Sequence, residues 1–247
     1  MRSTLSYSGQ TQRILERRIR NWELARSQRR AEAPPEERTI HPFIAISRMV
    51  GAGGSYVGRA VADELGWSVF DRELLDVMAS DDEVRRRVYA IEDEHERSLL
   101  EDVLLSIGYH GPGERDDYFH RLARASVAIA TREPAVFVGR GVGFILPAAS
   151  GVTVRIVASV DYCDARYAVR RNLPADHARK ERRDKEADRI RYLKKHGRRR
   201  FADLSGFDLT VAVDRIGPRE AINVITALAR SRFGTYLSHA APSEPRP

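Results

Sequence analysis

The chain contains one cysteine, Cys163, among its 247 residues. A single cysteine cannot form an internal disulfide, and no His or Cys lies near it at zinc-site spacing, so we expect a packed thiol. The sequence also lacks any apolar run of about twenty residues, and its first residues show no leader in which charge precedes an apolar stretch. These absences argue against a membrane span and against export, and they predict a cytoplasmic protein.

Negative charge is in deficit, and the deficit is local. The chain has 42 Lys and Arg against 35 Asp and Glu, a formal net charge of +7, and its isoelectric point is near 9.8. Residues 176–200 alone carry twelve Lys or Arg against five Asp or Glu, so the rest of the chain is balanced. One basic segment on a neutral body favours an anionic ligand bound by a single element and disfavours nucleic acid, although an RNA-binding stripe stays as an alternative.

Apolar runs alternate with helical patterns after residue 40, which predicts an α/β fold with a doubly wound parallel sheet. Expected strands are "FIAIS" (43–47), "WSVFD" (67–71), "AVFVGRGVGFIL" (135–146), "VTVRIVAS" (152–159) and "FDLTVAVD" (207–214). Expected helices cover residues 55–66, 81–107 as one helix or two, 118–131, the charged region up to 200, and 218–233.

The chain divides into three predicted parts. Residues 1–40 comprise a basic amphipathic helix over 11–33 and a linker, which suggest docking to a protein partner or self-association. Residues 41–235 form the main domain, with a helical insertion at 81–131, and residues 236–247 are predicted to be a disordered tail.

The stretch "ISRMVGAGGSYVGRA" (46–60) has the layout of a phosphate-binding loop, in which an apolar strand enters a glycine cluster that opens a helix. Laid over the pattern GxxxxGK(S/T), Gly53 and Ser55 match, but Gly54 takes the place of the lysine and Arg48 takes the place of the first glycine. Of the two nearby cations, Arg48 and Arg59, we expect Arg48 to replace the lysine because it leaves the strand directly into the loop. A helix entry without a ligand is the alternative.

Three motifs in order resemble the cytidylate kinase-like family, a branch of the P-loop nucleoside monophosphate kinases. They are the loop at 46–60, the "VFDRELL" that follows it (69–75), and "VFVGRGVGFIL" about sixty residues later (136–146). The similarity spans residues 42–232. It implies a P-loop kinase-like fold with a helical acceptor-binding insertion and a basic lid, and nucleotides as substrates.

The resemblance also implies roles for individual residues. The donor nucleotide ATP would be held through its phosphates by Gly51, Gly53, Gly54 and Ser55, with Ser55 on Mg²⁺ and Arg48 as charge partner. Asp71 and Arg72 match the start of the acceptor site, and Arg140 matches the arginine of a "DGRD" motif that contacts the acceptor nucleotide. Val138 and Gly141 replace the two aspartates of that motif, and no clear Walker B aspartate is present, which leaves the acceptor and the metal ligands open.

The basic segment 176–200 resembles the lid of these kinases, in which arginines close over the phosphates. On this basis Arg189 and Arg191 are the expected phosphate clamps, while Arg166 could pack over the adenine. A charged helix is otherwise most often a solvated face.

Three functions follow from these patterns. The first is an ATP- and Mg²⁺-dependent nucleoside monophosphate kinase acting on CMP, dCMP or a related small phosphate acceptor. The second is a nucleotide-binding regulatory protein with weak or no turnover. The third is an RNA-binding protein, for which the segment offers only Tyr192 and Phe201 as stacking aromatics.

Overall fold

The computed structural model describes residues 13–14, 16–21, 24, 40–82, 84, 94–106, 118–196 and 206–239. Its strands are β1 (Phe43–Arg48), β2 (Ser68–Asp71), β3 (Ala135–Val138), β4 (Gly151–Val157) and β5 (Leu209–Ala212). Its α-helices are α2 (Gly54–Leu65), α3 (Arg72–Ser80), α5 (Glu94–Ser106), α6 (Tyr118–Ala130), α7 (Val160–Arg171), α8 (Ala175–His196), α9 (Val213–Ile216) and α10 (Pro218–His239). Two 3₁₀ turns, η2 (Val142–Phe144) and η3 (Ala148–Ser150), precede β4.

The five strands form one parallel sheet in the order β2-β3-β1-β4-β5. β1 lies at the centre, where Phe43 pairs with Ala135 of β3 and Gly151 of β4. All carboxyl ends therefore lie along one edge, and the glycine loop leaves the sheet from its central strand. Open α/β sheets bind ligands at this edge.

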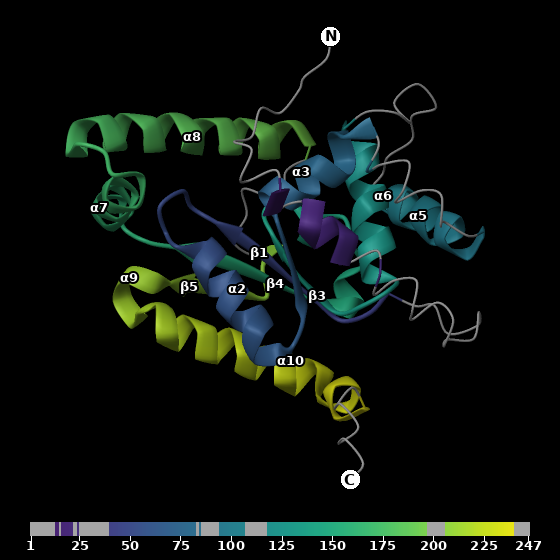
Figure 1. Cartoon of the computed structure of the whole chain (residues 1–247). Coiled ribbons are helices and arrows are strands. Elements are labelled where there is room, and N and C mark those ends of the chain that lie inside the picture. Colours follow the sequence, from purple (N-terminus) through teal and green to yellow (C-terminus); the bar gives the residue numbers. More distant parts are fainter. Residues whose placement is uncertain are drawn as a thin grey trace.

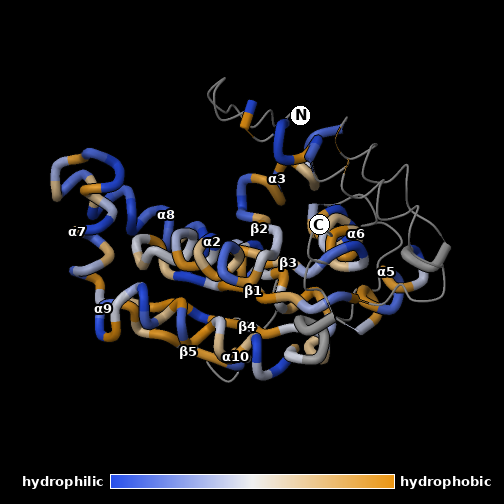
Figure 2. The backbone as a smooth tube through the Cα atoms, turned by 60° about the horizontal axis from the view of Figure 1, so that its bottom comes forward, coloured by the Kyte–Doolittle hydropathy of each residue, from blue (hydrophilic) through white to orange (hydrophobic). Residues whose placement is uncertain are grey.

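The strands are apolar on both faces because helices cover both faces (Figures 1 and 2). Successive β1 residues alternate between two cores: Phe43 and Ala45 pack with α3 and α6, whereas Ile44 and Ile46 pack with α2 and α10. α8 crosses the carboxyl edge of the sheet, from α7 on one side toward α3 on the other (Figure 1). The apolar layers thus hold the sheet rigid beneath a polar helix.

The predicted α/β parallel sheet is confirmed, with two strands shorter than expected. The run 135–146 was expected as one strand, but β3 ends at Val138 because Gly139, Arg140 and Gly141 all have positive φ. The run 207–214 contains only β5, since Val213 begins α9. The charged region at 176–200 is helical through His196, and the last helix extends from Pro218 to His239.

The described residues of the N-terminal segment pack onto this domain. Ile19 is 2% exposed and belongs to the α3 and α6 core, while Ile14 and Leu24 are exposed. Arg18 donates to Asp71 Oδ2 at 3.0 Å and to the carbonyl of Val69. The remaining parts of the predicted 11–33 helix, of the 81–131 insertion, of the lid beyond His196 and of the tail lie outside the described residues. Among the helices that the structure describes, none has the length and apolarity needed to cross a membrane.

Replacing Ile19 with alanine should destabilise the whole domain, because its side chain is buried in a core shared with α3 and α6. We expect a loss of about 2–5 kcal/mol in the free energy of unfolding, measured by chemical denaturation. Ile14→Ala, at a position 45% exposed on the same segment, is the matched control and should change it by less than about 0.5 kcal/mol. Equal effects of the two variants would contradict the packing of this segment.

Candidate functional site

The glycine loop between β1 and α2 presents unpaired backbone N–H groups. Gly51 (φ 95°) and Gly53 (φ 84°) adopt left-handed conformations, and Gly53 caps α2. Within the part of the chain that is described, no hydrogen-bond acceptor meets the N–H groups of Gly51, Gly53, Gly54 or Ser55. Free N–H groups at the start of a twelve-residue helix form a site suited to an anion.

The loop is closely backed by α7. A side chain at Gly51 would meet the backbone carbonyl oxygen of Cys163 at 2.5 Å, so this position requires glycine for space as well as for conformation. The Cys163 thiol is buried, and burial raises its pKa to about 11. The predicted packed thiol is thus consistent with a cysteine that is protonated and unreactive at neutral pH.

Arg48 occupies the space that a lysine side chain would need. A Cβ atom added at Gly54 would lie 2.5 Å from Cβ and 2.8 Å from Cγ of Arg48. The Arg48 guanidinium then lies against Gly139, where any side chain would overlap its Nη1 atom. Two glycines therefore form a slot for the Arg48 side chain, which explains why the lysine position of the loop is empty.

The Arg48 guanidinium is a cation without a counterion. Among the described residues, none makes a hydrogen bond or ion pair with it. Burial lowers its pKa to about 10; Glu73 partly opposes this effect, and the charges of Arg72, Arg189 and Arg140 add to it. Arg48 stays protonated at neutral pH, at the cost of repulsion that a bound anion would relieve.

A second guanidinium lies over the loop. A side chain at Gly53 would come within 3.0 Å of Nε and 3.1 Å of Cζ of Arg166, which extends from α7. The structure thus brings Arg166 to the phosphate-binding loop itself. Arg48 and Arg166 approach the free N–H groups from β1 and from α7.

α8 touches the loop through one carboxylate. Glu186 accepts a hydrogen bond from the Val50 N–H at 2.8 Å, and its other oxygen accepts from Arg189 at 2.5 and 3.1 Å. Burial would raise the pKa of Glu186, but these hydrogen bonds outweigh it and hold the pKa below its ordinary value. Arg189, one of the two predicted clamps, is therefore brought to the loop already paired with an acid.

Arg140 is at the centre of a second cluster, where four segments meet. Its Nε donates to Asp76 of α3 at 2.5 Å, its Nη2 donates to the other oxygen, and Tyr118 of α6 donates to the same carboxylate. The guanidinium also lies 4.8 Å from the ring centre of Tyr192 on α8. Burial disfavours the Arg140 cation, but Asp76 raises its pKa overall, and burial together with Asp76 raises the pKa of Tyr118.

The remaining predicted site residues lie farther from the loop or have other partners. Asp71 caps α3 by accepting from the Leu74 N–H at 3.1 Å, and it also pairs with Arg18. Arg191 is 76% exposed and pairs with Asp188, so it lies on the outer face of α8. Arg72 is half exposed and pairs with Glu73, while its charge still acts on Arg48.

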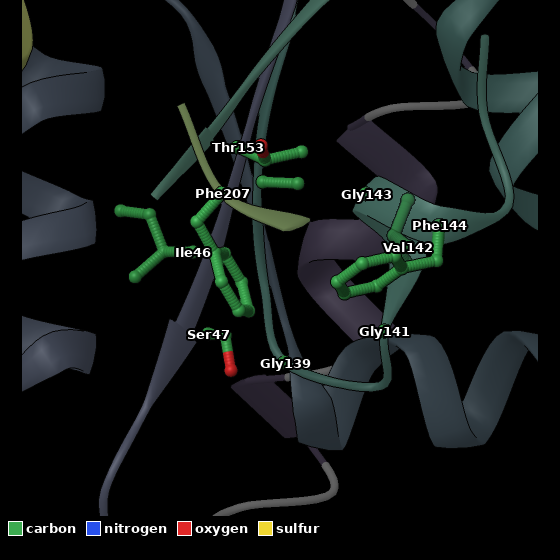
Figure 3. Close-up of a pocket in the computed structure, with 10 residues that line it drawn as sticks. Ile46, Ser47, Gly139, Gly141, Val142, Gly143, Phe144, Thr153 and Phe207 are labelled. Atoms are coloured by element: carbon green, nitrogen blue, oxygen red, sulfur yellow. The ribbon is translucent and has the colours of Figure 1, made fainter. Parts of the chain in front are cut away.

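A pocket with about 230 Å³ of empty space lies beside the Arg48 slot, at the carboxyl end of β1 (Figure 3). Phe144 and Phe207 make an edge-to-face contact in its wall, with ring centres 5.4 Å apart, and Arg155 lies 5.5 Å from the Phe207 ring. Burial and the charge of Arg189 lower the pKa of Arg155. The pocket is smaller than the roughly 300–1,000 Å³ of ordinary ligand sites, so it would accommodate only part of a ligand. Its lining residues are Ala45, Ile46, Ser47, Gly139, Gly141, Val142, Gly143, Phe144, Thr153 and Phe207.

Sequence reasoning did not identify Asp76, Glu186 or Gly139. Asp76 lies within an otherwise apolar face of α3, and a lone acid on a buried face is a signal for a buried ion pair. Glu186 carries no such signal, because it is one acid among many on a charged helix. Gly139 precedes Arg140 in the third motif, but its role depends on Arg48 arriving from another strand.

Comparison with known proteins places these observations in a family. Residues 43–215 match the cytidylate kinase-like family, which confirms the resemblance predicted from the three motifs. No curated protein matches the chain.

Solved structures similar to this chain share its fold. They include an uncharacterized protein from Eubacterium ventriosum, with a TM-score of 0.60 and 20% identity over 77% of this chain and 99% of that one. A shikimate kinase from Bacteroides thetaiotaomicron has a TM-score of 0.43 and 16% identity over 76% and 97% of the two chains. A gluconokinase from Sinorhizobium meliloti has 0.40 and 18% over 80% and 99%.

Gly54→Ala should destabilise the protein by about 1–3 kcal/mol in the free energy of unfolding, because the new methyl group overlaps the Arg48 side chain. In an Arg48→Gly background the overlap is gone, and the two changes should be coupled by about 0.5–3 kcal/mol in a double-mutant cycle measured by denaturant unfolding. Gly234→Ala, where nothing lies within 4 Å of the added atom, is the control and should not destabilise. The same cost for Gly54→Ala in both backgrounds would rule out the slot.

Asp76→Ala should cost about 3–5 kcal/mol of stability, because it leaves the partly buried Arg140 without its carboxylate. Thermal and urea unfolding measure this loss. Asp188→Asn breaks the exposed pair with Arg191 and should change stability by less than about 1 kcal/mol. A loss at Asp76 no greater than that at Asp188 would show that the cluster does not support the fold.

Proposed function

The chain belongs to the cytidylate kinase-like family, and on this premise we propose that it is an ATP-dependent nucleoside monophosphate kinase whose acceptor is CMP, dCMP or a related small phosphate. One observation carries the proposal: the uncompensated Arg48 guanidinium lies in a slot beside four free N–H groups at the start of α2. A polyphosphate would supply the missing negative charge and accept those hydrogen bonds.

The donor side of the proposed site consists of the loop and two arginines. The N–H groups of Gly51, Gly53, Gly54 and Ser55 would hold the donor phosphates, with Arg48 in place of the usual lysine. Arg166 lies at Gly53, so it would face these phosphates more directly than the adenine. Phosphoryl transfer depends mainly on alignment and charge neutralisation, which this arrangement offers.

Mg²⁺ fits the proposed site through oxygen atoms that the loop and the donor provide. No group of three or more His, Cys, Asp or Glu able to hold a metal occurs among the described residues. Ser55, in the first turn of α2, would bind the ion together with phosphate oxygens and water. When bound, the ion neutralises charge on the transferred group.

The engaged carboxylates favour a phosphate acceptor over an alcohol. An alcohol must lose a proton as it attacks, whereas a phosphate monoester is already ionised near neutral pH. Asp76 is held by Arg140 and Tyr118, Glu186 by Arg189, and Asp71 by Arg18. In the proposed reaction an acceptor phosphate oxygen bonds to the γ-phosphorus, the bond from that phosphorus to the bridging oxygen breaks, and its electron pair leaves with ADP.

The acceptor would lie beneath α8, between Arg140 and the pocket beside Arg155. Arg189 acts electrostatically on both Arg48 and Arg155, which supports a location between the donor loop and the pocket. The aromatic walls suit the planar part of an acceptor. The helical insertion at 81–131 stays a proposal for the far side of this site.

The charge on α8 gives little support to RNA binding. Five of its cations pair with acids on α7 or α8, which lowers the charge available to a phosphate backbone. They are Arg179, Arg182, Lys185, Arg189 and Arg191. A nucleotide-binding protein without turnover is the second candidate, because it would use the same donor loop.

ADP formation from ATP and Mg²⁺ should require one member of a panel of CMP, dCMP, UMP, AMP and GMP. Arg48→Ala should lower kcat/KM by about 10²- to 10³-fold, because it removes the cation that faces the transferred phosphoryl group. Coupled spectrophotometric assay measures the turnover, and calorimetry measures ATP binding separately.

Arg183→Ala is the control, since Arg183 is exposed on α8 and belongs to no contact described above. It should leave both quantities unchanged. ATP binding without turnover on any acceptor would favour the regulatory candidate. Unchanged ATP affinity in Arg48→Ala would refute the role of Arg48, and binding that ignores ATP but falls steeply with salt would favour RNA.

A further inference from the structure

We propose that Glu186 is a positioning residue that takes the place of the donor phosphate on the empty loop and yields its partners, Val50 N–H and Arg189, when nucleotide binds. The inference rests on the proposed function, and it deepens that function by assigning how α8 responds to the donor.

The Glu186 carboxylate makes two contacts that a phosphate would make. One oxygen accepts from a backbone N–H of the glycine loop, that of Val50, at 2.8 Å. The other accepts from the Arg189 guanidinium at 2.5 and 3.1 Å. An anion held jointly by a loop N–H and an arginine is the arrangement expected of a bound phosphate group.

The other acids of α8 described here do not reach the loop. Glu181 accepts from Tyr167 and Lys185, and Asp188 pairs with the exposed Arg191. The Glu186 and Arg189 side chains are 14% and 17% exposed, whereas those of Asp188 and Arg191 are 68% and 76% exposed. Two ion pairs with the same spacing on one helix thus differ in that only the pair at 186 and 189 lies at the candidate site.

Arg189 links the two halves of the site. Its charge lowers the pKa of Arg48 at the donor loop and that of Arg155 beside the pocket. While Glu186 holds it, Arg189 is neutralised and compact. A phosphate that displaces Glu186 from Val50 would also present Arg189 with a stronger anion, so donor binding would place this cation between donor and acceptor.

The contact has a measurable cost for nucleotide binding. A ligand that must displace an internal group binds more weakly, by the fraction of molecules in which that group is already absent. Removing Glu186 should therefore tighten nucleotide binding, whereas removing a residue that merely supports the fold would not. The sign of the change distinguishes the two roles.

The experiment compares Glu186→Gln with wild type by calorimetric titration of the full chain with the β,γ-imido analogue of ATP and Mg²⁺. We expect about tenfold tighter binding in the variant. Asp188→Asn removes a carboxylate from an equivalent pair and should change affinity less than about twofold. Glu73→Gln removes a charge that acts on Arg48 without touching the loop, and its effect should be clearly smaller than that of Glu186→Gln.

Unchanged or weaker binding in Glu186→Gln would overturn the inference, and so would an equal gain in Glu73→Gln, because charge alone would then explain it. If wild type fails to bind the analogue, the proposed kinase itself fails. Amide hydrogen exchange without ligand gives a second readout: Glu186→Ala should accelerate exchange at Val50, and unchanged exchange there would show that Glu186 does not cover this amide.

Discussion

The confinement of Arg48 between two glycines determines most of the candidate site. Its stem fills the space of a side chain at Gly54, and its head lies where a side chain at Gly139 would lie. The loop after β1 and the turn after β3 are therefore shaped around one cation. That cation is kept charged against burial and against neighbouring arginines, which makes the site complementary to an anion before any ligand arrives. The glycine at the lysine position is then a steric requirement of this loop and no sign of decay.

The basic helix α8 is ordered by acids as much as by bases. Arg182 bonds Asp164 of α7, Glu186 bonds the loop, and Tyr192 packs on Arg140, so the helix is held over the carboxyl edge of the sheet at three places. Its positive charge is largely paired inside the protein, and the surplus evident in the sequence overstates what a partner would meet. The Asp76 cluster extends the same logic to α3 and α6, where one carboxylate collects donors from Arg140 and Tyr118.

The fold was predictable because its signals are local: apolar strands, a glycine-opened helix and their alternation. The error at 135–146 arose because Gly139 and Gly141 sit in an apolar run, and only their positive φ values end the strand. The loop residues were predictable from the motif, whereas the partners were not. Arg189 and Arg191 look equivalent two residues apart, yet helical geometry turns them to different sides, and only contacts distant in sequence reveal which one meets the loop. Glu186 and Asp76 were missed for the same reason.

The three contacts of α8 also constrain how the chain can vary in length. Arg182, Glu186 and Tyr192 meet α7, the glycine loop and Arg140 from one continuous helix, so their relative directions are set by residue count alone. One inserted or deleted residue between them would rotate the later contacts by about 100° around the helix axis. A segment that reads as repetitive charge, and therefore as tolerant, is thus one of the parts of the chain least able to accept an insertion.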